Sequence, residues 1–381
     1  MKLCFVCHGY PPAKLGGVEV LTQALARGLV AKGHAVWVVG YCDGYQTVTT
    51  DDDCGVQVVR LPTVKRGVFP AVLPVHLRLE SAIRRLIREH GIELVECPDV
   101  GGSLLLGHFG VPLVVKMRGA NIVYMPSTGR KAPRLTPFFE KRTLHLATHL
   151  LAVSKYIRDA TLDAAGLHGR TCEVIYNGVD IHRFKPDPEI DRDPNRILFV
   201  GRLTETKGAP YLFRALPAIF ERFPDAYLRF IGEDRLDREG VRASVRLLAE
   251  LPESYRPKAE IVGQMPHEAL PQECQRAAVA VFPSRAEALG MVALEAVRCG
   301  LPVIASRRPG FEELVVDSEA GVLVDDPEDA DTPAEAILEL LCDPEKAQRM
   351  GRASHIQSLE YLPEKINERF KRVVPDILSE G

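Results

Sequence analysis

The sequence predicts an α/β protein of two domains, each with a mostly parallel β-sheet and helices on both faces. Short apolar runs alternate with amphipathic helical patterns along most of the chain, which is typical of repeated βα units. A length of 381 residues is too large for one ordinary core. A polar stretch rich in proline and acids, residues 176–196, separates the halves. We therefore place the domains at residues 1–188 and 189–362.

The first half begins with a strand, a glycine pair and a helix. Its strands are predicted at residues 3–7, 35–41, 56–61, 94–97, 113–117, 150–153 and 173–176. Gly16 and Gly17 open the helix that follows the first strand. Two glycines at a helix start let another molecule approach the backbone closely, although a simple tight turn would have the same sequence.

The second half repeats the βα pattern. After a strand that begins at Ile197, further strands are predicted at residues 227–231, 261–262, 279–282, 303–305 and 322–324. Arg202 and Lys207 follow the first strand at its carboxyl end, where open α/β sheets bind ligands. Two cations there would neutralise a diphosphate leaving group, and the alternative is that both are solvated surface residues. Gly232 ends the next strand in a tight turn.

Residues 282–306 carry the densest group of candidate site residues. They predict a strand, a loop with Glu287, a helix and a second buried strand. The helix begins with Gly290, Met291 and Val292. Amides of a first helical turn lack partners within the helix and attract an anion. Glu287 could accept hydrogen bonds from sugar hydroxyls, and Glu295, about two turns into the helix, could bind a ribose diol. Two solvated acids are the alternative.

Composition excludes several classes of protein. Hydrophobic residues at 46% and charged residues at 26% are typical of a globular protein, and no apolar run reaches the roughly 20 residues that cross a bilayer. The net charge of −3 argues against a general nucleic-acid binder. The nine cysteines are odd in number, so we expect reduced thiols and not a disulfide framework. No signal-peptide pattern is recognised, so we expect a cytoplasmic protein that could be peripheral at the inner face of the membrane.

Two short motifs are of kinds that can bind metal, but their surroundings in the sequence do not favour a metal site. Cys4 and Cys7 form a lone C-x-x-C on a strand, where their odd spacing directs them to opposite faces. Residues 51–53 contain D-x-D, but we interpret them as a solvated acidic loop. We expect no metal site at either position.

The motifs together resemble the retaining GT-B glycosyltransferases of family four, also called glycosyl transferases group 1. The E-x7-E region of that family is matched at Pro283, Ser284, Glu287, Gly290, Glu295, Ala296, Gly300, Pro302 and Val303. Other family motifs are matched at Gly16, Gly17, Glu19, Gly33, His34, Asn177, Gly178, Val179, Asp180, Arg183, Phe184, Pro186, Arg202, Lys207 and Gly208. The resemblance therefore extends through both halves of the chain.

The resemblance implies a GT-B fold: two facing Rossmann-like domains with an inter-domain cleft, and a last helix at about 363–381 that returns to the first domain. A UDP-, GDP- or ADP-sugar donor would bind the second domain and a sugar, glycan or lipid-linked acceptor the first. Arg202 and Lys207 would stabilise the diphosphate, Glu287 the donor sugar and Glu295 the ribose. The Gly16-Gly17 turn would close over the diphosphate. Neither metal nor cofactor is implied.

The chain departs from the family at one position and carries one further basic feature. Arg118 precedes Gly119 where relatives usually have histidine before glycine. It could contact a phosphate or carboxylate of the acceptor or donor, or be a surface arginine at a strand end. The basic helix predicted around residues 77–90 could lie on anionic lipid or simply be solvated.

Three other functions remain as alternatives to a glycosyltransferase, and each has its own requirement. A nicotinamide oxidoreductase would need G-x-G-x-x-G after a strand, which is absent from such a setting. A nucleotide-sugar epimerase on the same fold needs no acceptor. A non-catalytic sugar-nucleotide-binding protein is a third alternative, if Arg118 marks a lost acceptor site.

Overall fold

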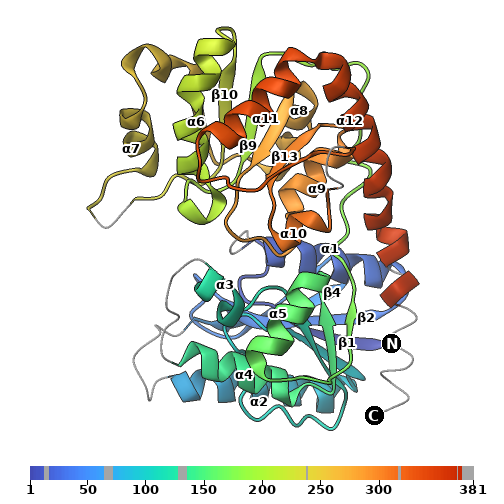
Figure 1. Ribbon diagram of the computed structural model, residues 1–381. Coiled ribbons are helices and arrows are strands. Elements are labelled where there is room, and N and C mark those ends of the chain that lie inside the picture. Colours follow the sequence, from blue (N-terminus) through green and yellow to red (C-terminus); the bar gives the residue numbers. More distant parts are fainter. Residues whose placement is uncertain are drawn as a thin grey trace. The chain divides into compact units, whose positions relative to one another are not determined.

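The structure is a computed structural model that describes residues 1–12, 17–63, 72–127, 135–236, 239–315, 319–366 and 368–370. The chain forms two compact units, each built around one β-sheet (Figure 1). The first unit is Met1–Asn177 with the chain from Glu368, and the second is Gly178–Asn367. Of the helix predicted at 363–381, residues 363–366 and 368–370 are described, and they are helical.

The division between the units comes earlier than the predicted boundary at residue 188. The amide of Val179 donates to the carbonyl of Tyr361 at 3.4 Å. The buried ring of Phe184 packs against His267, with 5.2 Å between ring centroids. These contacts attach the start of the polar stretch to the second unit.

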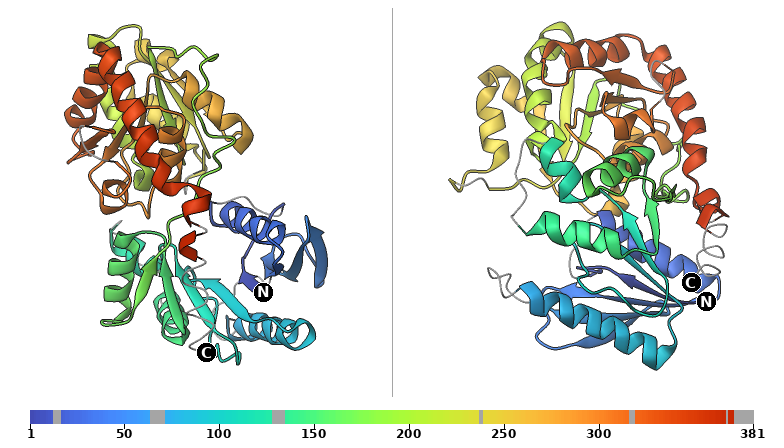
Figure 2. Two further views of the ribbon diagram at one scale, coloured as in Figure 1. Left: turned by 90° about the vertical axis from the view of Figure 1, so that its right-hand side faces the viewer. Right: turned by 60° about the horizontal axis from the view of Figure 1, so that its bottom comes forward.

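The first unit has an eight-stranded sheet in the order β3-β4-β2-β1-β5-β6-β7-β8. Its strands are β1 Lys2–Val6, β2 Ala35–Cys42, β3 Thr49–Asp53, β4 Val56–Pro62, β5 Leu94–Pro98, β6 Leu113–Met117, β7 His149–Ala152 and β8 Cys172–Val174. Its helices are α1 Gly17–Ala31, α2 Val72–His90, α3 Asn121–Ser127, α4 Thr136–Leu146 and α5 Lys155–Ala165. Helix α1 covers one face of the sheet, and α2 and α4 lie on the other (Figure 2), where His76 stacks on Phe139. The parallel strands expected from the sequence are all present.

Strand β3 was not predicted: residues 51–53 form an edge strand and not a loop, although Asp51 and Asp52 are exposed to solvent as expected. Strand β3 pairs antiparallel with β4. Asp53 accepts hydrogen bonds from Tyr10 at 2.8 Å, Gln23 at 3.1 Å and Arg27 at 3.0 Å. The hydrogen bond from Arg27 lowers the pKa of Asp53. The D-x-D sequence therefore secures an edge strand to α1 and to the turn after β1.

Three buried carboxylates organise the loops at the carboxyl edge of this sheet. Asp99 accepts the amides of Arg118 and Ala120 at 2.8 and 3.1 Å. Glu140 accepts the amides of three further residues, Gly101, Asn121 and Ile122, at 2.9 to 3.0 Å. Glu80 accepts those of Leu105, Leu106 and Gly107. Burial raises the pKa of Asp99 to about 6. These eight backbone amides are thus satisfied by buried side chains of the same unit.

The second unit has a six-stranded parallel sheet in the order β11-β10-β9-β12-β13-β14. Its strands are β9 Arg196–Val200, β10 Tyr227–Ile231, β11 Ala259–Gly263, β12 Val279–Phe282, β13 Val303–Ser306 and β14 Val322–Val324. Its helices are α6 Ala209–Arg222, α7 Ala243–Glu250, α8 Leu270–Arg276, α9 Met291–Arg298, α10 Pro309–Glu312, α11 Asp331–Cys342 and α12 Pro344–Gln357, with 3₁₀ turns η1 Glu205–Lys207, η2 Glu253–Lys258, η3 His267–Ala269 and η4 Ser358–Tyr361.

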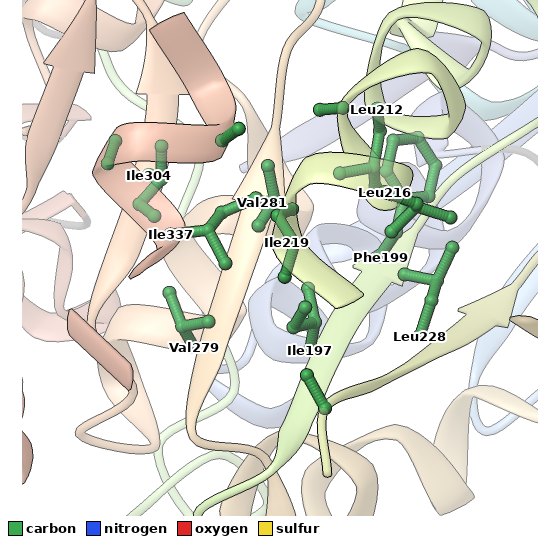
Figure 3. Close-up of a cluster of buried hydrophobic side chains, with 14 of the residues drawn as sticks. Ile197, Phe199, Leu212, Leu216, Ile219, Leu228, Val279, Val281, Ile304 and Ile337 are labelled. Atoms are coloured by element: carbon green, nitrogen blue, oxygen red, sulfur yellow. The ribbon is translucent and has the colours of Figure 1, made fainter. Parts of the chain in front are cut away.

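The core of this unit lies between the sheet and helices α6 and α11 (Figure 3). Strand residues Ile197, Val279 and Ile304 meet Ile219 of α6 and Ile337 of α11 there, and each is fully buried. Burying such side chains stabilises the fold by about 1.5–3 kcal/mol each. Because β9 and β12 both contribute to this core, their carboxyl ends are held side by side.

The cysteines behave as the sequence predicts. All nine are free thiols, and Cys4 and Cys7 are buried in the first unit. Burial raises the pKa of both thiols to about 12, which disfavours the thiolate that a metal requires. Among the described residues, no group of three or more His, Cys, Asp and Glu side chains is placed to hold a metal ion.

Lys116 provides a pH-dependent test of the first unit. This lysine of β6 is only 7% exposed, and burial lowers its pKa from 10.5 to about 8. The unfolded chain holds the Lys116 proton more tightly, so this residue makes stability rise as pH increases from about 8 to about 10.5. We expect Lys116→Met to raise the free energy of unfolding at pH 7 by about 1–3 kcal/mol, and this gain to shrink by pH 10.

Urea unfolding followed by the fluorescence of Trp37, the single tryptophan, measures this effect because Trp37 lies on β2 of the same unit. The exposed Lys141 of α4 supplies the control, since Lys141→Met should leave stability nearly unchanged. Equal stability of the wild type and Lys116→Met at pH 7 would contradict the prediction.

Candidate active site

The candidate site lies where the strand order of the second sheet reverses. From β9 the chain proceeds to β10 on one side and later returns to β12 on the other. In open parallel sheets the loops that leave two such strands diverge, and the crevice at their carboxyl ends binds ligands. The loop after β9 contains Arg202 and Lys207, and the loop after β12 contains Glu287. Residues 80 positions apart in sequence therefore meet at this point.

Lys207 and Glu287 form an ion pair across the reversal point. The Lys207 ammonium donates to Oε1 of Glu287, and the hydroxyl of Ser284 lies 3.3 Å from the same oxygen. The side chains are 27% and 15% exposed, so both charged groups keep access to solvent. The pair confirms that these two residues lie together, as their positions after adjacent strands imply.

Arg202 is exposed and follows β9 directly. Its guanidinium makes no hydrogen bond or ion pair with any residue that the structure describes. Among the described residues it therefore has no counter-charge, unlike Lys207.

Glycines allow the loops of the site to approach one another. A Cβ on Gly208 would lie 1.9 Å from the carbonyl oxygen of Pro283, and one on Gly232 would lie 1.8 Å from that of Gly201. Gly208 also has φ +75°, which L side chains rarely adopt. The predicted turn at Gly232 is thus a point of backbone contact between the ends of β9 and β10.

Helix α9 presents its amino terminus at the same edge of the sheet. Gly290 is its N-cap, with φ 80°, and no side chain caps the first turn. The helix proper begins with Met291 and Val292. Glu295 therefore lies just over one turn into α9, rather than the predicted two turns, because that prediction counted eight residues from Glu287 and the chain from Glu287 to Gly290 is not helical.

Glu295 has a partner that the sequence analysis did not identify. Its Oε1 lies 2.8 Å from Nε2 of His267, and its side chain is 11% exposed. The hydrogen bond to Glu295 raises the pKa of His267. His267 lies in η3, 28 residues before Glu295, and no spacing rule links the two positions in the sequence.

The other candidate residues lie in the first unit. Gly17 begins α1, whereas Gly16 lies outside the described residues. Arg118 is neither free for a ligand nor a surface residue. Its side chain is 6% exposed, and Nη2 lies 3.1 Å from Glu96 Oε1. Nη1 lies 3.4 Å from the hydroxyl of Thr22 in α1. The predicted substrate contact of Arg118 is therefore not supported, because the guanidinium is turned into the protein toward a buried acid.

The basic helix around residues 77–90 is part of α2, and its apolar face is largely unavailable to lipid, although Leu77 is exposed. Ile83 and Leu86 are buried within the first unit. Arg84 donates to the carbonyl of His108, and Arg85 pairs with Glu89. None of the helices that the structure describes is long and apolar enough to cross a bilayer. Membrane contact through this segment stays a prediction that rests on its exposed arginines alone.

Solved structures similar to this chain show its fold class. Sucrose-phosphate synthase from Thermosynechococcus elongatus superposes with a TM-score of 0.81 at 23% identity, covering 100% of both chains. Anabaena HepE, solved in complex with UDP and glucose, gives a TM-score of 0.75 at 18% identity, covering 99% of this chain and all of the other. The two Rossmann-like sheets are those of the GT-B glycosyltransferase fold.

Sequence comparison defines the family. The model for "Glycosyl transferases group 1" matches residues 180–356, and that for "Glycosyltransferase Family 4" matches residues 15–183. The chain is 29% identical over 381 residues to the GDP-mannose-dependent alpha-(1-6)-phosphatidylinositol monomannoside mannosyltransferase of Mycolicibacterium smegmatis, covering 94% of each protein. The chain belongs to the group 1 glycosyltransferases of the GT-B fold.

The contact between Gly208 and Pro283 can be tested with a matched glycine. Gly208 and Gly240 have φ values of +75° and +78°, but nothing lies within 4 Å of a Cβ built on Gly240. Both alanine variants lose about 1 kcal/mol through backbone strain. Only Gly208→Ala adds a clash, so we expect at least about 2 kcal/mol more destabilisation from it, measured by urea unfolding followed by circular dichroism. Equal losses in the two variants would show that the loops do not meet closely.

Proposed function

We propose that this glycosyltransferase moves a sugar, with retention at the anomeric carbon, from a nucleoside diphosphate sugar to an acceptor hydroxyl. The observation that carries the proposal is the Lys207–Glu287 pair at the strand reversal, beside the uncapped start of α9. This arrangement combines a cation for phosphate with a carboxylate for sugar hydroxyls. Such groups are what a diphosphate-linked sugar requires.

The cations would stabilise the leaving diphosphate. Arg202 has no partner among the described residues, and Lys207 can exchange Glu287 for a phosphate oxygen. The amides at the start of α9, at Met291 and Val292, supply further donors for the anion. Negative charge that develops as the sugar leaves would thus be stabilised by groups already in place.

The displaced carboxylate has a complementary role. When Lys207 turns to the diphosphate, Glu287 becomes free to accept hydrogen bonds from donor-sugar hydroxyls. In a retaining front-face reaction, the bond between the anomeric carbon and the phosphate oxygen breaks. The acceptor oxygen forms the new bond on the same face, and its proton moves to the leaving phosphate oxygen. Each atom is accounted for without a covalent enzyme intermediate.

The donors we propose are UDP-, GDP- or ADP-sugars, and the acceptors are sugars, glycans or lipid-linked glycans. Support comes from the relatives: one is named as GDP-mannose-dependent and acts on a phosphatidylinositol mannoside, and HepE was solved with UDP and glucose. A diphosphate site at helix α9 serves any of the three nucleotides, because phosphate is their common part.

Replacing the charged site residues tests this function. Lys207→Met, Arg202→Met and Glu287→Gln should each lower kcat by about 100-fold or more, since each removes a group that contacts the donor. Release of UDP, GDP or ADP from a panel of their sugars measures the rate, and NMR of the product gives the anomeric configuration. Arg222→Met, which breaks an exposed ion pair with Glu335 in the same unit, is the control and should keep full activity. Full activity of Lys207→Met would refute the proposal, and an inverted product would refute retention.

We also propose that transfer needs no metal ion, because Arg202 and Lys207 supply the positive charge that a metal supplies in other glycosyltransferases. Activity measured with excess EDTA should equal activity without it. A strict requirement for Mn²⁺ or Mg²⁺ restored after chelation would contradict this assignment.

A further inference from the structure

Three side chains from separate segments of the second unit form a hydrogen-bonded series that ends at Glu295. Arg183 precedes the first strand of the unit, His267 begins η3, and Glu295 lies on α9. Nη1 of Arg183 lies 3.2 Å from Nδ1 of His267, and Nε2 of His267 lies 2.8 Å from Oε1 of Glu295. Both nitrogens of the imidazole are therefore engaged.

The order of donors in this series is fixed by chemistry. A guanidinium has only donors, so Nδ1 of His267 must be the acceptor of its contact with Arg183. The ring proton then resides on Nε2, which donates it to Glu295. In this arrangement the Nε2–H of the imidazole faces the Glu295 carboxylate, and Arg183 selects the tautomer that makes this hydrogen bond possible.

The surroundings hold the histidine ring in place. The buried ring of Phe184 packs against His267 with 5.2 Å between centroids. Arg183 is itself restrained by Asp180, at 3.7 Å from its Nε, and by Glu268, at 3.4 Å from its Nη1. The ring therefore has packing on one side and a restrained donor at Nδ1, which leaves little freedom for Nε2.

One carboxylate oxygen of Glu295, Oε2, is available to accept hydrogen bonds from a ligand. Oε1 accepts from His267, whereas Oε2 accepts no hydrogen bond from any residue that the structure describes. A vicinal diol presents two hydroxyl donors that a fixed carboxylate can receive together. The side chain keeps 11% exposure, so a ligand can reach it.

We propose that His267 and Arg183 are positioning residues that fix the Glu295 carboxylate for the vicinal diol of a nucleotide ribose. The inference rests on the proposed function, since the diol belongs to the nucleoside diphosphate of the donor. It adds two residues that act through Glu295 and do not contact the reacting atoms. Their contribution is to the recognition of ribose, not to the chemistry of transfer.

Binding of nucleotides with and without the diol tests the inference. Titration calorimetry with UDP, GDP and ADP identifies the nucleotide that the full-length wild type binds, and its 2′,3′-dideoxy form is then compared. We expect the wild type to prefer the ribonucleotide by about tenfold or more, because a hydrogen bond to a charged group is lost with the diol. His267→Phe keeps the ring packing on Phe184 but has no donor, so it should abolish the preference by weakening only ribonucleotide binding.

Conservative and control variants separate positioning from folding. His267→Gln can place an amide donor near Nε2 and should restore most of the preference. Arg183→Met releases the tautomer of His267 and should reduce the preference in part, with a smaller effect on folding because its side chain is 36% exposed. His355→Phe on α12 removes a histidine that hydrogen-bonds the carbonyl of Arg298, and it should leave the preference unchanged.

The outcomes are distinguishable. Loss of the preference in His267→Phe with recovery in His267→Gln supports the inference. An undiminished preference in both His267→Phe and Arg183→Met overturns the inference. Equal binding of the ribonucleotide and the dideoxynucleotide by the wild type also overturns it. In either case the proposed function stands, because the nucleotide still binds. If the wild type binds none of the three nucleotides, both the proposed function and this inference are wrong.

Discussion

The site of the second unit depends on the parallel pairing of β9 with β12, two strands that are far apart in the sequence. Their pairing through Ile197 and Leu198 is stabilised by the hydrophobic core that α6 and α11 cover. It brings the carboxyl ends of both strands to one point, and Gly208 permits the two loops to touch there. The opposite charges of Lys207 and Glu287 could not meet without this pairing. The hydrophobic core thus determines where the polar chemistry occurs.

Of the three charged candidate residues that follow β9 and β12, Lys207 and Glu287 form an ion pair. Arg202 is exposed and has no partner in the part of the chain that the structure describes, and a guanidinium on the surface costs little because water hydrates it. A diphosphate would change the partners without requiring a new charge to be buried alone. Because the Lys207–Glu287 pair is partly exposed, its attraction is screened and the exchange is energetically accessible.

The sequence predicts the sheets well because buried parallel strands are continuous apolar runs. The strand at 279–282 was placed from its apolar run and the proline after it, and Lys207 and Glu287 were found because both follow such strands. Strand β3 was missed since Thr49–Asp53 has no apolar residue, and its stability comes from distant partners such as Arg27. The burial of Arg118 and the pairing of His267 with Glu295 were equally out of reach, because both depend on contacts between elements remote in the sequence.

The loops after β5 and β6 and the loop before α9 differ in the partners of their backbone amides. In the first unit, Asp99, Glu140 and Glu80 are buried acids that accept those amides, so the protein supplies its own anions. In the second unit no side chain caps the start of α9, and the nearby acid, Glu287, accepts from Lys207 instead. Uncompensated amides and a cation at one edge favour an external anion. The same Rossmann-like architecture therefore carries buried acids that accept loop amides in the first unit, and a helix start without a side-chain cap beside a lysine in the second.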